Sequence, residues 1–133
     1  MKKIKDVIRI TGLSRRTLQY YDDLGIVKAT RTKDNYRLYG KEELWKLWRL
    51  LIYKEMGFQL DEIKEMLNQD EQSAAWRLEK RMQELEKEID DLKRERCFVQ
   101  KVLEYGIPDE AFVNRISKVT SYKDMASHLS GRM

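Results

Sequence analysis

Apolar residues recur at intervals of three and four along most of the chain, which is the spacing of one face of an α-helix. The first run stops at Gly12, and the second begins after Ser14, a residue type that caps helix N-termini, and stops at Gly25. Two further runs are separated by Gly57, and the longest ends at Gly106, just before the single proline. The pattern predicts helices over residues 4–11, 15–24, 41–56, 58–68 and 71–105.

Between the second and third of these segments the pattern changes. Residues 28–32 and 36–40 contain β-formers, and the polar residues 33–35 separate them. Asn35 tolerates the left-handed backbone conformation that a tight turn requires. We therefore predict a small hairpin in this part of the chain, and its lysines and arginines make it basic.

The longest predicted helix also carries a heptad seam, a stripe of apolar residues at alternating spacings of three and four. Its positions are Ala75, Leu78, Met82, Leu85, Ile89, Leu92, Arg96, Val99 and Leu103. Such a narrow stripe on a charged helix predicts a coiled-coil dimer, and packing within the chain is the alternative. In a parallel dimer Arg96 would face the partner's Arg96, so the seam favours antiparallel helices.

Three tryptophans are interpreted as packing residues. Trp45 and Trp48 lie three residues apart on the third predicted helix, and we expect them in the core, partly against the partner's long helix. Trp76 lies where the longest helix begins, and there too we expect packing rather than a ligand pocket.

Composition indicates a mostly α-helical chain and excludes several kinds of site. The 133 residues are 41% hydrophobic and 38% charged, with six glycines and one proline, which argues against an all-β domain and against disorder. One cysteine, Cys97, and one histidine, His128, are too few for an internal disulfide or a typical metal site. No segment is apolar enough to span a membrane, so we expect a soluble, cytoplasmic protein with neither metal nor cofactor.

The basic residues are concentrated at the start of the chain. Residues 1–41 hold 11 Lys and Arg against 4 Asp and Glu, whereas the whole chain holds 27 against 23. On a helix that begins at residue 15, the side chains of Arg15, Arg16, Gln19 and Tyr20 share one face, and Leu18 lies on the other. One face of this helix is suited to a core and the other to a polyanion such as nucleic acid.

A helix, a turn, a basic helix, a basic hairpin and further helices, in this order, are typical of the winged helix-turn-helix, whose second helix enters a DNA major groove. The chain carries TGLSRRTLQYYDDLG at residues 11–25, YRLY at 36–39 and MGFQLDEI at 56–63. Through these stretches it resembles the MerR family of bacterial transcription regulators. We expect a winged helix-turn-helix domain over 1–70, a coiled-coil dimerisation helix over 71–105 and a short helical tail over 106–133.

The resemblance implies which residues contact DNA. They are Arg15, Arg16, Thr17, Gln19, Tyr20, Lys33, Tyr36 and Arg37. Among them, Arg16 and Arg37 would contact phosphates or bases. The family usually has Arg where Gln19 stands, Gly where Asn35 stands and Pro where Ala29 stands. Glutamine pairs well with adenine, so Gln19 either alters the preferred DNA site or is a polar residue that faces solvent.

The same resemblance implies a homodimer that binds double-stranded DNA at a palindromic promoter site and distorts it for RNA polymerase. Metal sensors of the family have cysteines near the end of the long helix, where this chain has Cys97 alone. Multidrug sensors of the family have a large C-terminal domain, so we expect a small effector or none. A protein-interaction adaptor built on the coiled coil is the alternative function. No set of nucleophile and base indicates an enzyme.

Overall fold

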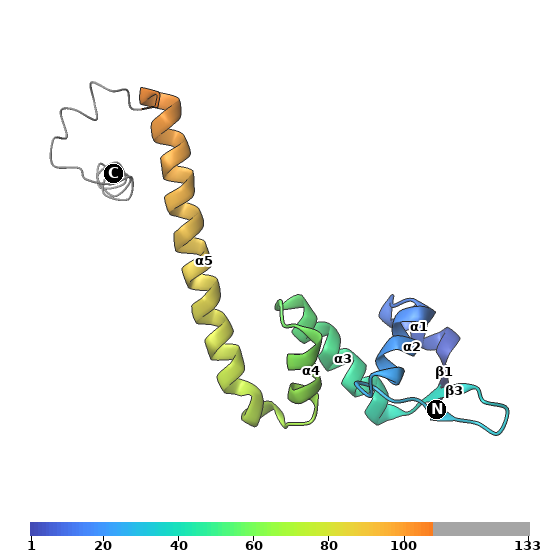
Figure 1. Ribbon diagram of the computed structural model, residues 1–133. Coiled ribbons are helices and arrows are strands. Elements are labelled where there is room, and N and C mark those ends of the chain that lie inside the picture. Colours follow the sequence, from blue (N-terminus) through green and yellow to red (C-terminus); the bar gives the residue numbers. More distant parts are fainter. Residues whose placement is uncertain (108–133) are drawn as a thin grey trace. The chain divides into compact units, whose positions relative to one another are not determined.

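The structure is a computed structural model that describes residues 1–107, and these residues fall into two compact units (Figure 1). The first unit, Met1–Leu78, contains a small sheet, four helices and the first turns of a fifth helix. Within the described residues, the second unit is the rest of that fifth helix. The expectation of a mostly α-helical fold with a long helix after the first domain is confirmed. The helices expected in the tail lie outside the described residues.

The helices α1 (Ile4–Thr11) and α2 (Arg15–Asp23) form the helix-turn-helix. Gly12 ends α1 with a φ of 73°, in the left-handed region that glycine adopts without strain. Ser14 begins α2, because its Oγ accepts a hydrogen bond of 3.0 Å from the backbone N–H of Thr17. Both boundaries of the turn are therefore fixed by local chemistry.

A three-stranded antiparallel sheet with the order β1-β3-β2 completes the winged part of the domain. The strands β2 (Thr30–Arg31) and β3 (Arg37–Tyr39) form the predicted hairpin, which projects from the unit in Figure 1. The strand β1 (Lys2–Lys3) was not predicted, because two residues are too few to show a periodicity. It pairs with β3 so that Lys3 lies opposite Leu38, and this pairing holds the start of the chain against the hairpin.

The helices α3 (Lys41–Glu55) and α4 (Leu60–Leu67) pack against each other and complete a single core. The most deeply buried large side chains come from α1 to α4, from β3 and from the segment after α2. They are Val7, Leu18, Tyr21, Val27, Tyr39, Leu47, Leu50, Ile63 and Met66. The predicted burial of the Leu18 face of α2 is confirmed.

Trp45 and Trp48 are not part of this core. Their side chains are 52% and 53% exposed, so the expectation that they are buried within the chain is wrong. α3 buries Leu47, Leu50 and Tyr53 instead, and the helical repeat places the two tryptophans on its other side. Their packing against the partner's long helix stays a prediction. Trp76 is also exposed, with the guanidinium of Arg77 lying 4.9 Å from its ring centre.

Arg49 ties α3 to the end of α4. Its Nη2 atom donates hydrogen bonds to the Tyr53 hydroxyl at 2.9 Å and to the backbone oxygens of Met66 and Gln69 at 3.0 and 3.1 Å. The last carbonyl groups of a helix have no partner within the helix, and a cation there also interacts favourably with the helix dipole. Arg49, on the neighbouring helix α3, therefore caps the C-terminal end of α4.

Asp70 caps the start of the fifth helix, α5 (Glu71–Tyr105). The Oδ1 atom of Asp70 accepts a hydrogen bond of 2.6 Å from the backbone N–H of Ser73. This hydrogen bond is the main reason why the pKa of the Asp70 carboxyl is lower than its ordinary value, and the charge of Arg49 contributes less. The folded chain thus favours the ionised form of this cap.

The first turns of α5 belong to the winged domain. Arg77 forms ion pairs with Glu62, at 3.9 Å, and with Glu65 of α4. Ala74 is fully buried, and Leu78 packs against the core. The compact unit therefore runs through Leu78. The domain boundary predicted at residue 70 stays a prediction.

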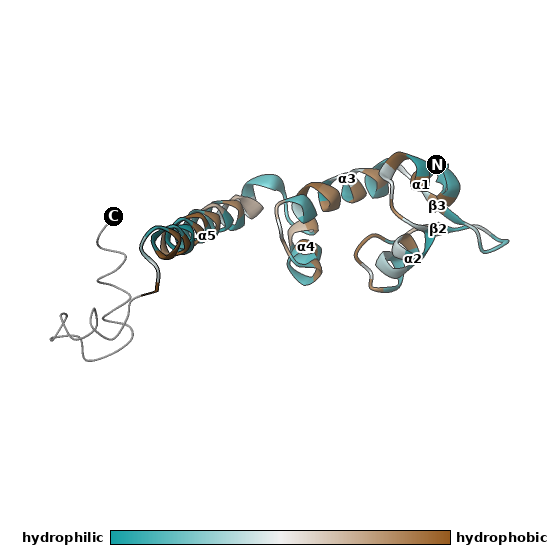
Figure 2. Cartoon of the chain, turned by 90° about the horizontal axis from the view of Figure 1, so that it is seen from above, coloured by the Kyte–Doolittle hydropathy of each residue, from teal (hydrophilic) through white to brown (hydrophobic). Residues whose placement is uncertain are grey.

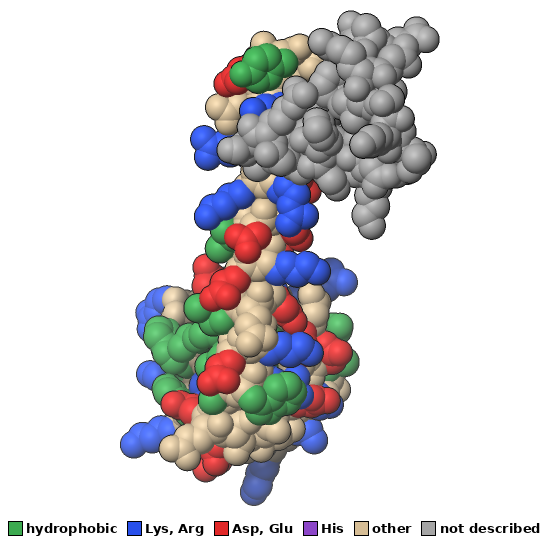
Figure 3. Space-filling view, turned by 90° about the vertical axis from the view of Figure 1, so that its left-hand side faces the viewer, with side chains coloured by type: hydrophobic (Ala, Val, Ile, Leu, Met, Phe, Trp, Pro, Cys, Tyr) green, Lys and Arg blue, Asp and Glu red, His purple; other side chains and the backbone are tan. Residues whose placement is uncertain are grey.

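Beyond Leu78 much of the apolar seam of α5 faces solvent in the single chain. Met82, Ile89, Leu92, Val99 and Leu103 are 50 to 81% exposed. Figure 2 shows apolar bands recurring along the helix, and Figure 3 shows acidic and basic side chains interspersed on it. The helix therefore combines a charged surface with an uncovered apolar stripe.

Arg49→Met is expected to destabilise the winged domain by about 2 kcal/mol, because it removes hydrogen bonds to buried acceptors but keeps most of the apolar stem. Urea unfolding followed by circular dichroism measures the change. Arg9→Met is the control, since the Arg9 side chain is 81% exposed and pairs with Asp6 three residues away on the same helix. Equal unfolding midpoints for the two variants would contradict the role of Arg49.

Asp70→Asn is expected to reduce the acid sensitivity of folding. Asparagine also caps helices, so the neutral variant keeps the cap at every pH. Because the folded-state pKa of Asp70 is lowered, its ionised form adds stability above its ordinary pKa, and this contribution is lost as the pH falls through the folded-state value. Unfolding midpoints at pH 7 and pH 3 should therefore differ less in the variant than in the wild type, and an unchanged difference would refute the assignment.

Candidate nucleic-acid interface

The exposed face of α2 carries the basic residues that the sequence placed there. Arg15 and Arg16 are exposed in its first turn, and Tyr20 is 52% exposed one turn later. Leu18 and Tyr21 on the other face are 1% and 2% exposed. The helix is thus held by one face and presents two guanidinium groups and a phenol to solvent, which are donors suited to phosphate and base edges.

Two other predicted contact residues of α2 are less available. The Thr17 side chain is half-buried, and its hydroxyl lies 2.8 Å from the Ser14 hydroxyl, so it takes part in the cap of the helix. Gln19 is also half-buried. The DNA contacts of both residues stay predictions.

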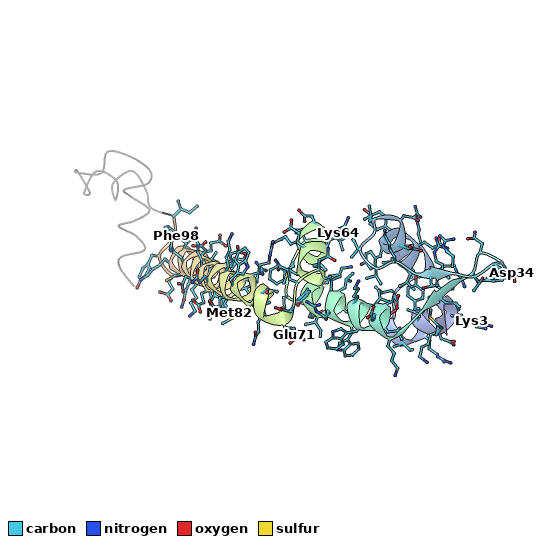
Figure 4. The ribbon with its side chains drawn as sticks, turned by 90° about the horizontal axis from the view of Figure 1, so that it is seen from below. Lys3, Asp34, Lys64, Glu71, Met82 and Phe98 are labelled. Atoms are coloured by element: carbon cyan, nitrogen blue, oxygen red, sulfur yellow. The ribbon has the colours of Figure 1, made fainter. Side chains whose placement is uncertain are left out.

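The hairpin brings a second set of polar groups beside α2. Asn35 adopts a φ of 64°, and its backbone N–H donates to the Thr32 carbonyl at 2.9 Å. The Thr32 N–H in turn donates to the Tyr36 carbonyl at 3.0 Å, which closes the turn. Tyr36 is 70% exposed and Lys33 is exposed close to the tip, which Asp34 marks in Figure 4. Asn35 thus provides the backbone geometry for which it was singled out.

Arg37 lies at the base of the hairpin and points to α2. Its Nε atom donates a hydrogen bond of 2.9 Å to Oδ2 of Asp22, and its Nη2 atom lies 3.9 Å from the Asp23 carboxylate. Its side chain is only 17% exposed. The guanidinium predicted to contact DNA is therefore engaged with acids of the chain itself.

The charges around Asp22 also act on a buried phenol. Tyr39 is fully buried, and its hydroxyl has no hydrogen-bond partner in the structure. Burial raises its pKa above the ordinary value, and the negative charge of Asp22 raises it further, whereas Arg37 and Arg31 act in the opposite direction. The Tyr39 phenol is therefore neutral at physiological pH.

A groove of about 570 Å³ separates the start of α2 from the hairpin. Its lining contains four cationic side chains and no acidic one. The lining residues are Lys3, Ile4, Lys5, Arg15, Thr32, Asn35, Tyr36, Arg37 and Leu38. The structure thus brings three of the predicted contact residues, Arg15, Tyr36 and Arg37, to one cationic surface.

Lys3 and Lys5 also line this groove, but they were not among the predicted DNA contacts. Figure 4 labels Lys3, which reaches the groove because β1 pairs with β3. The charge excess of residues 1–41 was the only signal of this role in the sequence. Lys33 lies on the same hairpin but does not line the groove.

Two other kinds of functional feature are absent from the described residues. Among residues 1–107, no three His, Cys, Asp or Glu side chains are grouped so that they could hold a metal ion. No helix in this part of the chain is long and apolar enough to cross a membrane. The cationic surface is the feature on which a function can be built.

Comparisons with known proteins place this chain among DNA-binding regulators. A family model described as "MerR HTH family regulatory protein" matches residues 2–70, and a second one, "MerR, DNA binding", matches residues 45–96. The chain is 45% identical over 67 residues to the HTH-type transcriptional activator mta of Bacillus subtilis (strain 168), which covers 50% of the chain and 26% of that protein. Over 116 residues it is 30% identical to the HTH-type transcriptional activator TipA of Streptomyces coelicolor, with coverage of 82% and 46%. The chain thus spans about a quarter and about half of these relatives.

One solved structure is similar to most of this chain. The N-terminal part of the Bacillus subtilis multidrug transporter activator, MtaN, superposes with a TM-score of 0.71 at 33% sequence identity. The match covers 77% of this chain and 98% of MtaN. The similarity therefore extends beyond the winged domain into the long helix.

Proposed function

The chain belongs to the MerR family of helix-turn-helix regulatory proteins, and on that premise we propose that it is a transcription regulator that binds promoter DNA as a homodimer. The observation that carries the proposal is the exposed basic face of α2 beside a groove lined by Lys3, Lys5 and Arg15, and by Arg37, whose charge Asp22 partly balances. Such a surface neutralises backbone phosphates and releases their counterions, which drives binding to duplex DNA. The protein would act in the cytoplasm.

In the proposed complex α2 lies in a major groove and the hairpin follows the neighbouring backbone. Arg15 and Arg16 would donate hydrogen bonds to phosphates or base edges. The hydroxyls of Tyr20 and Tyr36 would donate hydrogen bonds to phosphates. Lys33, close to the hairpin tip, would add a phosphate contact. Gln19 is half-buried, so it would read a base only where its amide reaches the base edges in the DNA major groove. Thr17 would position the first turn of α2 through its hydrogen bond with Ser14.

The exposed seam of α5 supports the dimer. Solvent-exposed apolar residues at heptad spacing are costly in a single helix and are covered when two such helices pair. We propose antiparallel pairing, which separates Arg96 from the partner's Arg96 and lets the arginine stem pack beside a leucine while its head reaches solvent. Two copies of the winged domain would then meet two half-sites of a palindrome.

The proposal extends to the promoter. A dimer that bends or untwists its site pays a deformation energy of a few kcal/mol, and RNA polymerase can respond to the altered spacing of promoter elements. The two relatives are named transcriptional activators, which supports a role at promoters. We propose that the effector is small or absent. A protein-interaction adaptor is the competing function, and it requires no DNA binding.

Arg16→Ala is expected to weaken binding to duplex DNA and to reduce the slope of log affinity against log salt by about one unit, since one phosphate contact is lost. The measurement is a salt titration by fluorescence anisotropy, with a duplex selected from a random pool by the wild-type protein. Arg9→Ala, the loss of an exposed arginine on α1, should leave the slope nearly unchanged. A wild-type protein that selects no duplex would refute DNA binding, and equal slopes for all proteins would refute the role of Arg16.

Cysteine cross-linking tests the direction of the α5 helices. In a Cys97→Ser background, Met82→Cys should form a disulfide readily when mixed with Leu92→Cys or Val99→Cys, the positions that two antiparallel registers place opposite residue 82. All three side chains are about equally exposed in the single chain, at 59, 62 and 61%. Two Met82→Cys chains would be about 15 Å or more apart in either register, too far for a disulfide. Rapid cross-linking of Met82→Cys with itself would show parallel helices.

A further inference from the structure

We propose that Asp22 is a positioning residue that holds the hairpin against α2, and that Arg37 contributes to DNA binding through Asp22 rather than by touching DNA. The inference rests on the proposed function for its effect on DNA affinity. Its structural part, the attachment of the hairpin, stands without DNA.

Asp22 lies near the end of α2 and contacts both strands of the hairpin. Its Oδ2 atom accepts the 2.9 Å hydrogen bond from Nε of Arg37 on β3 and lies 3.7 Å from Nη2 of Arg31 on β2. The Asp22 and Arg37 side chains are 12% and 17% exposed, so water screens their attraction less than at the open surface. One carboxylate therefore links α2 to both strands.

Asp22 also reduces the repulsion between two arginines inside the hairpin. Arg31 and Arg37 are direct partners in the register of β2 and β3. Like charges directly opposite each other destabilise an antiparallel pair. Because the Asp22 carboxylate lies near both guanidinium groups, it offsets their repulsion, and without it the two strands would repel each other at this position.

The attachment continues to the turn of the hairpin. Nη1 of Arg31 donates a hydrogen bond of 2.9 Å to the side-chain oxygen of Asn35, the residue with the left-handed backbone. Asp22, Arg31 and Asn35 thus form a connected series from α2 to the turn. The exposed Tyr36 follows Asn35 directly, so its position depends on this series.

The sign of one charge effect separates this role from a direct contact. An acid beside a DNA-binding surface repels phosphate, so its neutralisation alone should strengthen binding. If Asp22 positions the hairpin, its neutralisation should instead weaken binding. Asp23 is the matched control, because it is the adjacent carboxylate on α2, is 72% exposed and lies 3.9 Å from the same guanidinium.

The first measurement needs no DNA. Hydrogen exchange of the hairpin amides, read by NMR with the α3 and α4 amides as internal reference, should become about tenfold faster in Asp22→Asn, because the neutral side chain loses the charge that attracts both Arg37 and Arg31. In Asp23→Asn it should stay as in the wild type. Equal hairpin exchange in the two variants would overturn the proposal, whether or not the protein binds DNA.

The second measurement is the affinity for the duplex that the wild type selects. Asp22→Asn should bind about tenfold more weakly, whereas Asp23→Asn should bind equally well or more tightly. Arg37→Lys keeps the positive charge but loses the Nε donor, so it should lose as much affinity as Asp22→Asn, and the double variant should lose no more than either. Tighter binding by Asp22→Asn, or full affinity of Arg37→Lys, would overturn the proposal.

Two controls keep these results interpretable. If Asp22→Asn also accelerates exchange in α3 and α4, the whole domain is destabilised, and Arg37→Lys then decides the proposal by the same hairpin readout. If the wild type selects no duplex, the proposed function fails, while the exchange data still decide whether Asp22 holds the hairpin.

Discussion

The burial of one face of α2 is the constraint on which the basic surface depends. Leu18 and Tyr21 enter the core, which fixes the rotation of the helix about its axis and turns Arg15 and Arg16 outward. Tyr39 of β3 is buried in the same core, so the hairpin is anchored by the packing that orients the helix. A change in this core would therefore move both parts of the surface together.

Cations placed at helix ends make short helices sufficient for this fold. Helices as short as α2 and α4 are marginal in isolation, and most of their stability must come from tertiary contacts. The Lys64 amino group donates to the backbone oxygen of Leu24 at the end of α2, and Arg49 does the same at the end of α4. Each helix is thus closed by a side chain from another helix, which couples the formation of one element to the next.

Much of this could be predicted from the sequence, since local chemistry determines it. Periodicity located the helices, and Gly12 and Ser14 set the boundaries around the turn. Periodicity identifies an apolar face but not whether it is covered, and α3 has apolar residues on both sides, so Trp45 and Trp48 were assigned wrongly. The partners of Arg37 were also missed, because Asp22 lies fifteen residues away and meets it only after the hairpin folds back.

The continuity of α5 makes the number of its residues a structural parameter. Its first turns are fixed to α4 through Arg77, and the same uninterrupted helix carries the exposed seam. Each residue turns an α-helix by about 100°, so one residue inserted after Leu78 would move every later seam position to another face of α5 than the one it shares with Ala75 and Leu78, without changing any side chain. The number of residues between Arg77 and Met82 therefore sets the face of α5 on which the seam begins, independently of which side chains fill that stretch.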